Sequence, residues 1–175
     1  TTPDLHIDIG SRIDGLVAHL ATFRPVEVYD LRPISHTAHP NIIFKQADIF
    51  DLELTSVTDS LSCLHALEHF GLGRYGDPIH PSGHIIGVRK MIRMVSKGGH
   101  LYLSFPIGSK DRVAFNAHRV FDPRSILTWP DVEENLDLQV FHYVDDNGDL
   151  HKNVDLSGES FNLNYGCGIY HFIKV

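Results

Sequence analysis

The feature that most constrains this chain is an alternation of short, β-rich apolar runs with helical or loop segments. Such an alternation is typical of α/β folds built on a mostly parallel sheet. No helix-length periodic segment separates the last two runs, so we expect them to pair as an antiparallel hairpin. The runs predict strands at 5–9, 26–29, 42–44, 60–64, 101–105, 138–144 and 168–175.

Helical spacing of apolar residues predicts the positions of the main helices. The first is expected at 13–20, before a proline that cannot continue it. The second is expected at 85–95, with the glycine pair 98–99 as its C-terminal cap. Residues 123–129 are expected to form a short helix with Asp122 as its N-cap.

Length, charge and cysteine content narrow the class of protein. The chain has 175 residues, of which 42% are hydrophobic, and we expect one domain spanning 1–175. Its net charge is -7 and its basic residues are scattered, which disfavours binding to nucleic acid or to an acidic membrane surface. No apolar run approaches the ~18 residues of a membrane helix. Cys63 and Cys167 are typical of reduced thiols in a cytoplasmic protein, with a bridge between them left open.

Polar residues follow four successive predicted strands at the point where each strand ends. Asp8 and Gly10 close the first, Asp30 ends the second, Asp48 follows the third and 65–69 follow the fourth. In an open α/β sheet, ligands bind at these carboxyl ends. A glycine turn lets a ligand approach the backbone. Asp30 can accept ribose hydroxyls, and Asp48 can accept the amino group of a base. The pattern therefore predicts a nucleoside site.

The order of these motifs resembles class I S-adenosylmethionine-dependent methyltransferases. Each motif alone is common, but five in this order and spacing are far more specific. Segments 66–78 and 116–121 further resemble a methyltransferase-like family of unknown function. The five motifs are the glycine turn at 6–11, the acidic strand end at 28–30, the adenine-type motif at 46–49, the fourth-strand motif at 58–65 and the segment 92–104 before the fifth strand.

The resemblance implies a Rossmann-like fold with a mostly parallel seven-stranded sheet in the order 3-2-1-4-5-7-6, strand 7 being antiparallel. It also implies S-adenosylmethionine as the cofactor, and the reaction needs no metal. Asp8 is expected both to place the cofactor and to hold the glycine turn. Asp30 is either the ribose acceptor, which we favour, or a turn cap. For Asp48, an adenine contact and the initiation of a turn are equal alternatives. The candidate cofactor-binding residues are Asp8, Gly10, Ser11, Arg12, Asp30, Asp48, Ile49 and His65.

The sequence departs from the family pattern in two places. Arg12 and Asp14 stand where the first motif usually has further glycines. Arg12 either crowds the methionine end of the cofactor or pairs with its carboxylate. The first predicted strand also lacks the preceding helices that usually cover the cofactor. We therefore expect a fragment, an open site or a site that a partner covers.

The candidate catalytic residues are Glu68, His69 and His118. Glu68 and His69 follow the fourth strand, where members of the resembled family often place catalytic or substrate-contacting groups. The alternative for both is a helix start or a surface pair. His69 can act as a general base, because an ordinary histidine titrates near pH ~6.5. A base is optional, since methyl transfer needs mainly the in-line alignment of an acceptor with the sulfonium.

The candidate substrate-binding residues are Tyr75, Asp77, His80 and Arg119. Three of them lie in the loop 71–84, and loops of this length without secondary structure are usually functional or disordered. Arg119 suits a carboxylate or phosphate, with a structural turn as an equal alternative. A zinc site from His80 and His84 is not expected, because proline and glycine between them oppose the helix that would align them. A loop-built site of these two histidines with Asp77 is a minor hypothesis.

These observations favour a methyltransferase acting on a small-molecule or sugar-containing acceptor. Oxygen is the expected acceptor atom by elimination, because no Asn-Pro-Pro-Tyr type motif follows the fourth strand. The alternative is a non-catalytic binding or scaffold module with a degenerate cofactor site, a question that depends on whether Arg12 occupies the cofactor cavity. A dinucleotide oxidoreductase is disfavoured, since the spacing of Gly10 and Gly15 does not match G-x-G-x-x-G.

Overall fold

The structure, a computed structural model, describes residues 4–34, 39–115, 117–158 and 161–175. No helix within these ranges combines the length and apolar character of a membrane span. The strands are β1 (His6–Ile9), β2 (Val26–Asp30), β3 (Ile42–Gln46), β4 (Thr58–Leu64), β5 (Val95–Ile107), β6 (Arg112–Ala114), β7 (His118–Val120), β8 (Leu136–Val144), β9 (Leu150–His151) and β10 (Gly166–Lys174). The α-helices are α1 (Gly15–Ala21), α2 (Gly83–Met94) and α3 (Pro130–Asn135), joined by 3-10 helices at Ile49–Asp51, Leu67–His69 and Ser125–Thr128.

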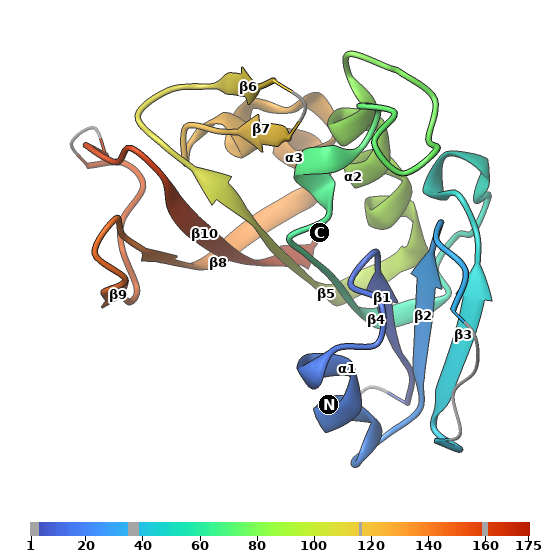
Figure 1. Ribbon diagram of the computed structural model, residues 1–175. Helices are drawn as coiled ribbons and strands as arrows, with labels where there is room; N and C mark the ends of the chain where they lie inside the picture. The colour runs from blue at the N-terminus through green and yellow to red at the C-terminus, as the bar shows by residue number, and fades with distance from the viewer. Residues whose placement is uncertain (1–3, 35–38, 116, 159–160) are drawn as a thin grey trace.

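One sheet orders its strands β3-β2-β1-β4-β5-β10-β8-β9 (Figure 1). The strands from β3 to β5 are parallel, and β10 runs antiparallel to both β5 and β8. The predicted Rossmann-like α/β class is therefore confirmed, and the final hairpin pairs as expected. The predicted count of seven strands is one short, because β9 pairs with the edge of β8. A separate small hairpin of β6 and β7 follows β5.

Two apolar clusters fix the helices on the sheet. Val17 of α1 packs with Val26 and Val28 of β2 in the smaller cluster. The larger cluster joins β1, β4, β5 and β10 with α2 and α3 and includes Ile7 and Ile9. Because side chains alternate along a strand, Asp8 of β1 points to the other face from these two isoleucines. Burial of the central strands on both faces makes a fixed base for the polar residues at their ends.

The junction between α2 and β5 corrects one prediction. Helix α2 ends at Met94 and the strand begins at once, so the glycine pair 98–99 lies within β5 and does not cap the helix. The register with β4 shifts here, because Thr58 pairs with Val95 whereas Ser60 pairs with His100. Gly98 has φ 78°, a conformation that glycine adopts without strain. The glycines accommodate a bulge in the sheet.

The segment after β7 also differs from the prediction. In place of one helix at 123–129, the 3-10 helix Ser125–Thr128 precedes α3. Pro130 begins α3, because its fixed φ and missing N–H suit the first turn of a helix. Asp122 does not cap either helix; its Oδ1 accepts a hydrogen bond from the backbone N of Arg124 at 2.9 Å.

Candidate active site

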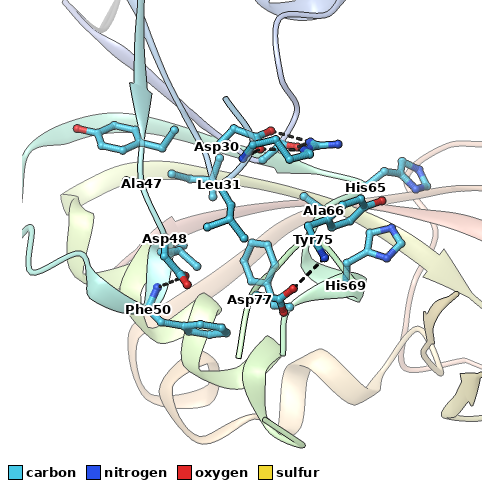
Figure 2. A pocket seen from close by; sticks show the side chains of 16 residues that line it. Asp30, Leu31, Ala47, Asp48, Phe50, His65, Ala66, His69, Tyr75 and Asp77 are labelled. Atoms are coloured by element: carbon cyan, nitrogen blue, oxygen red, sulfur yellow. Dashed lines mark hydrogen bonds and ion pairs between the residues drawn. The ribbon is translucent and has the colours of Figure 1, made fainter. Parts of the chain in front are cut away.

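A pocket opens at the carboxyl ends of β1, β2 and β4, beside the segment that follows β3 (Figure 2). β1 lies between β2 and β4, so the strand order reverses here, and such switch points are where open α/β sheets bind ligands. The predicted site residues that line the pocket are Gly10, Asp30, Asp48, Ile49, His65, His69, Tyr75 and Asp77. Its apolar walls come from Ile9, Tyr29, Leu31, Ala47, Phe50, Ala66 and Phe70.

Gly10 forms the floor of the pocket directly after β1. Its φ is 80°, and its backbone N donates to Tyr29 O at 2.8 Å. A Cβ at this position would lie only 2.6 Å from the Cβ of Ala66. The turn therefore requires glycine, both for its φ and for the space, and it exposes backbone to the pocket.

Asp30, at the end of β2, is held by an arginine that the sequence analysis missed. Its Oδ1 accepts from Arg32 N at 2.8 Å and Nε at 2.9 Å, and its Oδ2 accepts from Nη2 at 2.6 Å. An ionised carboxylate offers about four acceptor positions, so one on Oδ2 remains for a ligand hydroxyl. The pairing raises the pKa of Arg32, chiefly through the hydrogen bond to Asp30.

Arg32 also reaches across the pocket. Its Nη2 donates to Gly10 O at 3.0 Å, and its guanidinium carbon lies 4.8 Å from the ring centroid of Tyr75. The same Asp-x-Arg turn recurs outside this pocket, at Asp122 and Arg124. There the guanidinium donates to the carboxylate at 2.9–3.0 Å. The local turn is thus a structural unit, and the contacts across the pocket are what distinguish Arg32.

Asp48 and Ile49 lie after β3 on the opposite wall. Asp48 Oδ1 accepts from Phe50 N at 2.9 Å and so caps the 3-10 helix Ile49–Asp51. Ile49 is buried, and Ala47 and Phe50 flank it along the pocket. An acceptor oxygen next to a flat apolar wall suits a purine ring with an amino group.

Asp8, Ser11 and Arg12 do not line the pocket. Asp8 is fully buried and accepts from Ser62 Oγ at 2.5 Å, in a polar chain that continues to His6. Burial raises the pKa of the Asp8 carboxyl to about 6. Arg12 is exposed, with φ 60°, a left-handed conformation that is uncommon for a residue other than glycine. The arginine that meets the pocket is therefore Arg32.

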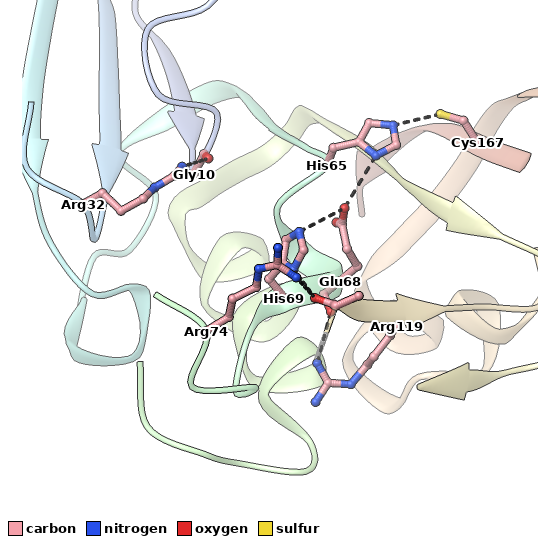
Figure 3. A network of polar contacts seen from close by, with 9 residues as sticks. Gly10, Arg32, His65, Glu68, His69, Arg74, Arg119 and Cys167 are labelled. Carbon is pink, nitrogen blue, oxygen red and sulfur yellow. Dashed lines mark hydrogen bonds and ion pairs between the residues drawn. The ribbon is translucent and has the colours of Figure 1, made fainter. Parts of the chain in front are cut away.

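The three predicted catalytic residues lie together beside the pocket. Glu68 is only 3% exposed, and its Oε1 lies 3.7 Å from His69 Nε2 and 3.5 Å from His65 Nδ1 (Figure 3). The ring of His118 meets the ring of His69 edge to face, with centroids 5.9 Å apart. Only His69 of the three lines the pocket itself.

The hydrogen bonds of His69 fix which of its nitrogens is basic. Its Nδ1 lies 3.0 Å from Ala117 O, and a carbonyl only accepts, so Nδ1 carries the proton. Nε2 is then the unprotonated nitrogen of the neutral ring. Burial lowers the pKa of His69, which favours this neutral form at pH 7. A neutral imidazole beside a buried carboxylate is suited to accept a proton.

Of the predicted substrate residues, Tyr75 and Asp77 line the pocket. Asp77 organises its own loop, because its carboxylate accepts from the backbone N of Gly71 at 2.8 Å and of Tyr75 at 3.2 Å. Tyr75 is 40% exposed and lies against His69, with ring centroids 5.4 Å apart. The loop therefore presents one aromatic side chain to the pocket.

His80 and Arg119 are placed elsewhere. His80 is exposed, and Arg119 is buried with its guanidinium donating to Phe70 O at 2.6 Å and Pro81 O at 3.0 Å. Arg119 thus ties both ends of the loop to β7. Asn116, part of the segment that the sequence analysis quoted, lies outside the described residues.

His84 does not join Asp77 and His80 in a loop site. Its ring packs against Phe121 and Trp129, with centroids 5.3 and 5.1 Å away, and burial lowers its pKa to about 4. Across the described ranges, no group of three or more His, Cys, Asp or Glu side chains is placed to hold a metal ion.

Comparisons with known proteins show which solved structures share this architecture. The family model described as "Caenorhabditis protein of unknown function, DUF268" matches residues 48–128, and no curated protein sequence matches the chain. The N-methyltransferase NodS of Bradyrhizobium japonicum, solved with S-adenosylhomocysteine, is similar in structure, with a TM-score of 0.64 and 16% identity over 98% of this chain and 78% of NodS. A Burkholderia thailandensis 1,6-didemethyltoxoflavin-N1-methyltransferase is similar with a TM-score of 0.59 and 14% identity, over 98% of this chain and 71% of that enzyme.

A third solved structure, the [4+2]-cyclase SpnF, gives a TM-score of 0.66 at 10% identity over 97% of this chain and 75% of SpnF. The chain therefore has the fold of class I S-adenosylmethionine-dependent methyltransferases, as the resemblance in the sequence predicted. A methyltransferase and a cyclase both match it, so the fold alone does not decide the reaction.

Proposed function

We propose that this chain is an S-adenosylmethionine-dependent methyltransferase that methylates an oxygen atom of a small-molecule or sugar-containing acceptor. The observation that carries the proposal is that Gly10, Asp30, Asp48, Ile49 and His65, which come from four separate segments, line one pocket at the switch point of the sheet. The cytosolic location expected from the cysteine content remains part of this proposal.

The pocket residues fit such a cofactor. A side chain at position 10 would clash with Ala66, so only glycine lets the chain turn here beside the pocket. Asp30 keeps one acceptor position on Oδ2 beside the three hydrogen bonds it receives from Arg32, enough for one ribose hydroxyl. Asp48 and Ile49 would hold the adenine. When bound, the cofactor supplies a methyl group activated by its sulfonium.

His69 and Glu68 account for the proton of the acceptor. A hydroxyl becomes a better nucleophile as its proton leaves, and His69 Nε2 is the neutral, basic nitrogen at the edge of the pocket. The imidazolium that results lies 3.7 Å from the buried Glu68 carboxylate, which stabilises its charge. Tyr75 packs edge to face against His69 at this edge of the pocket.

A second candidate function rests on Arg32. If its hold on Asp30 excludes the ribose, the chain is a non-catalytic binding or scaffold module on the same fold. The variant Arg32→Ala separates the two. The module alternative requires that only the variant binds S-adenosylhomocysteine, whereas the methyltransferase proposal requires binding by the wild type.

The proposal is tested by transfer of an isotopically labelled methyl group to a panel of hydroxyl-bearing small molecules, including glycosides, read by mass spectrometry. At donor concentrations that do not saturate the wild type, we expect labelled product with the wild type and at least about 10-fold less with Asp30→Ala. His69→Gln is expected to bind S-adenosylhomocysteine like the wild type but to slow transfer roughly 10²–10⁴-fold, the usual loss for a general base. Equal product from Asp30→Ala and the wild type would contradict the proposal.

A further inference from the structure

Cys167, His65 and Glu68 form a chain of contacts whose thiol the proposed methyl transfer does not use. Cys167 lies on β10, and its Sγ is 3.1 Å from His65 Nε2. The other ring nitrogen of His65, Nδ1, lies 3.5 Å from Glu68 Oε1 (Figure 3). A thiol, an imidazole and a carboxylate in this order are the arrangement in which a base activates a nucleophile and a third group orients the base.

The fold holds the three groups in place. His65 has φ 51°, a left-handed conformation that costs free energy for a residue with a side chain, and its N donates to Ser104 O at 2.9 Å. Cys167 is set by its register in the sheet, opposite Pro106 on one side and Val144 on the other. Strain of this kind persists where the surrounding structure over-determines it.

Glu68 is the second observation that indicates a site. It is 3% exposed, and within the described residues its Oε2 has no hydrogen-bond partner. A buried carboxylate favours a positive charge on an adjacent imidazole. The hydrogen bonds to Cys167 and then to Glu68 raise the pKa of His65 to about 10. Other titratable groups that interact with this cluster are Tyr165 before β10, Tyr170 on β10, Cys63 on β4 and His69 on the other side of Glu68.

Access distinguishes Cys167 from the other cysteine. Both thiols are free, but Cys63 is completely buried in β4, whereas Cys167 is partly exposed and the His65 side chain is 51% exposed. His65 also lines the open end of the pocket. A small molecule can therefore reach the sulfur without unfolding of the chain.

We propose that Cys167, His65 and Glu68 form a nucleophilic site that takes soft carbon electrophiles. The thiol proton passes to His65 Nε2 before the reaction, which leaves a thiolate paired with an imidazolium. As the Sγ–C bond forms, the leaving group departs with its electron pair. With iodoacetamide as the probe, the C–I bond breaks and iodide leaves. Glu68 stabilises the imidazolium, which later returns its proton to water. This site requires no cofactor, and it shares His65 and Glu68, but not the thiol, with the proposed methyl-transfer site.

The experiment measures the rate of Cys167 alkylation by iodoacetamide between pH 6.5 and 9.5, with peptide mass spectrometry to locate the label. An ordinary cysteine has a pKa near ~8.5, so its rate falls about 100-fold from pH 9.5 to pH 6.5. We expect less than a 10-fold fall for the wild type. His65→Gln is expected to react at least 10-fold more slowly at pH 6.5 and to match the wild type at pH 9.5, where the thiol ionises unaided.

Controls keep the result interpretable. The equal rates at pH 9.5 show that a variant is folded and its thiol accessible. Glu68→Gln is expected to fall between the wild type and His65→Gln at pH 6.5. His142→Gln on β8, a histidine whose Nδ1 accepts from Asn153 N, is expected to behave as the wild type. A wild-type rate that falls about 100-fold, or equal rates for the wild type and His65→Gln at pH 6.5, would overturn the proposal.

Discussion

Asp8 connects a single residue to the stability of the whole chain. Burial raises the pKa of its carboxyl from the ordinary value of 3.8 to about 6, so the folded state binds this proton more tightly than the unfolded state. The stabilising contribution of Asp8 is therefore complete below pH ~4 and is lost as the pH rises through about 6. His6 has the opposite sign, because burial lowers its pKa to about 4 and its contribution is lost as the pH falls through that value.

Asp8→Asn removes the pH-dependent contribution of Asp8 and keeps that of His6. We expect the free energy of unfolding of the variant, relative to the wild type, to rise between pH 4 and pH 7 by on the order of 2–3 kcal/mol, the equivalent of two pKa units. Urea unfolding of both proteins at several pH values measures this difference. A difference that does not change with pH would show that Asp8 titrates alike in the folded and unfolded states.

Among the residues that line the pocket, the sequence predicted the carboxylates at the strand ends but not the arginine whose side chain crosses the pocket. Asp30 and Asp48 were predicted because a carboxylate at a strand end has a defined place in an α/β sheet. Arg32 was missed because its importance comes from the direction of a long side chain, toward Gly10 O and Tyr75. The Asp-x-Arg pattern at 30–32 was a visible signal, and its recurrence at 122–124 shows what local structure it forms.

At the scale of elements, the loop between the 3-10 helix at Leu67–His69 and α2 depends on Arg119. Its guanidinium donates to the carbonyls of Phe70 and Pro81, which lie at the two ends of the loop. Arg119→Met leaves these acceptors without a donor. We expect a loss of about 1–3 kcal/mol in the free energy of unfolding, the usual range for a buried polar group left unpaired.

Hydrogen exchange separates this positioning role of Arg119 from substrate binding. In Arg119→Met, the amides of Gly71 and His80 are expected to lose protection, because they bond within the loop, while the amides of β1 keep theirs. Arg124→Met is the matched control, since that arginine is 41% exposed and pairs only locally with Asp122. It is expected to change stability by less than about 0.5 kcal/mol. Unchanged loop protection in Arg119→Met would favour a substrate role instead.

The elements themselves were predicted where periodicity and burial agree. The central strands were predicted correctly, because parallel strands that are buried on both faces appear in the sequence as continuous apolar runs. The glycine pair 98–99 was misread as a helix cap, since glycine serves equally in a cap and in a bulge, and only pairing with β4 decides between them. The short β9 has too few residues for any period to be detected.

For the whole molecule, chain order proved more informative than any single motif. Parallel strands connected in this order must bring their carboxyl ends to one edge, so the sequence could place the pocket and its polar lining. It could not predict the contact between Cys167 and His65, which are 102 positions apart and meet only through the pairing of β10 with β5. Contacts of this kind depend on the register between strands that are distant in the chain.

We propose that the switch-point pocket binds the methyl donor through Asp30. The most direct test is calorimetric titration of S-adenosylhomocysteine into the wild type, Asp30→Ala and Asp122→Ala. The last is the matched control, because it removes the same Asp-x-Arg pairing away from the pocket. We predict saturable binding by the wild type and by Asp122→Ala, and binding at least about 10-fold weaker, by about 1.4 kcal/mol, in Asp30→Ala. No binding by the wild type at millimolar ligand, or equal binding by Asp30→Ala, would contradict a role of this pocket in binding the donor.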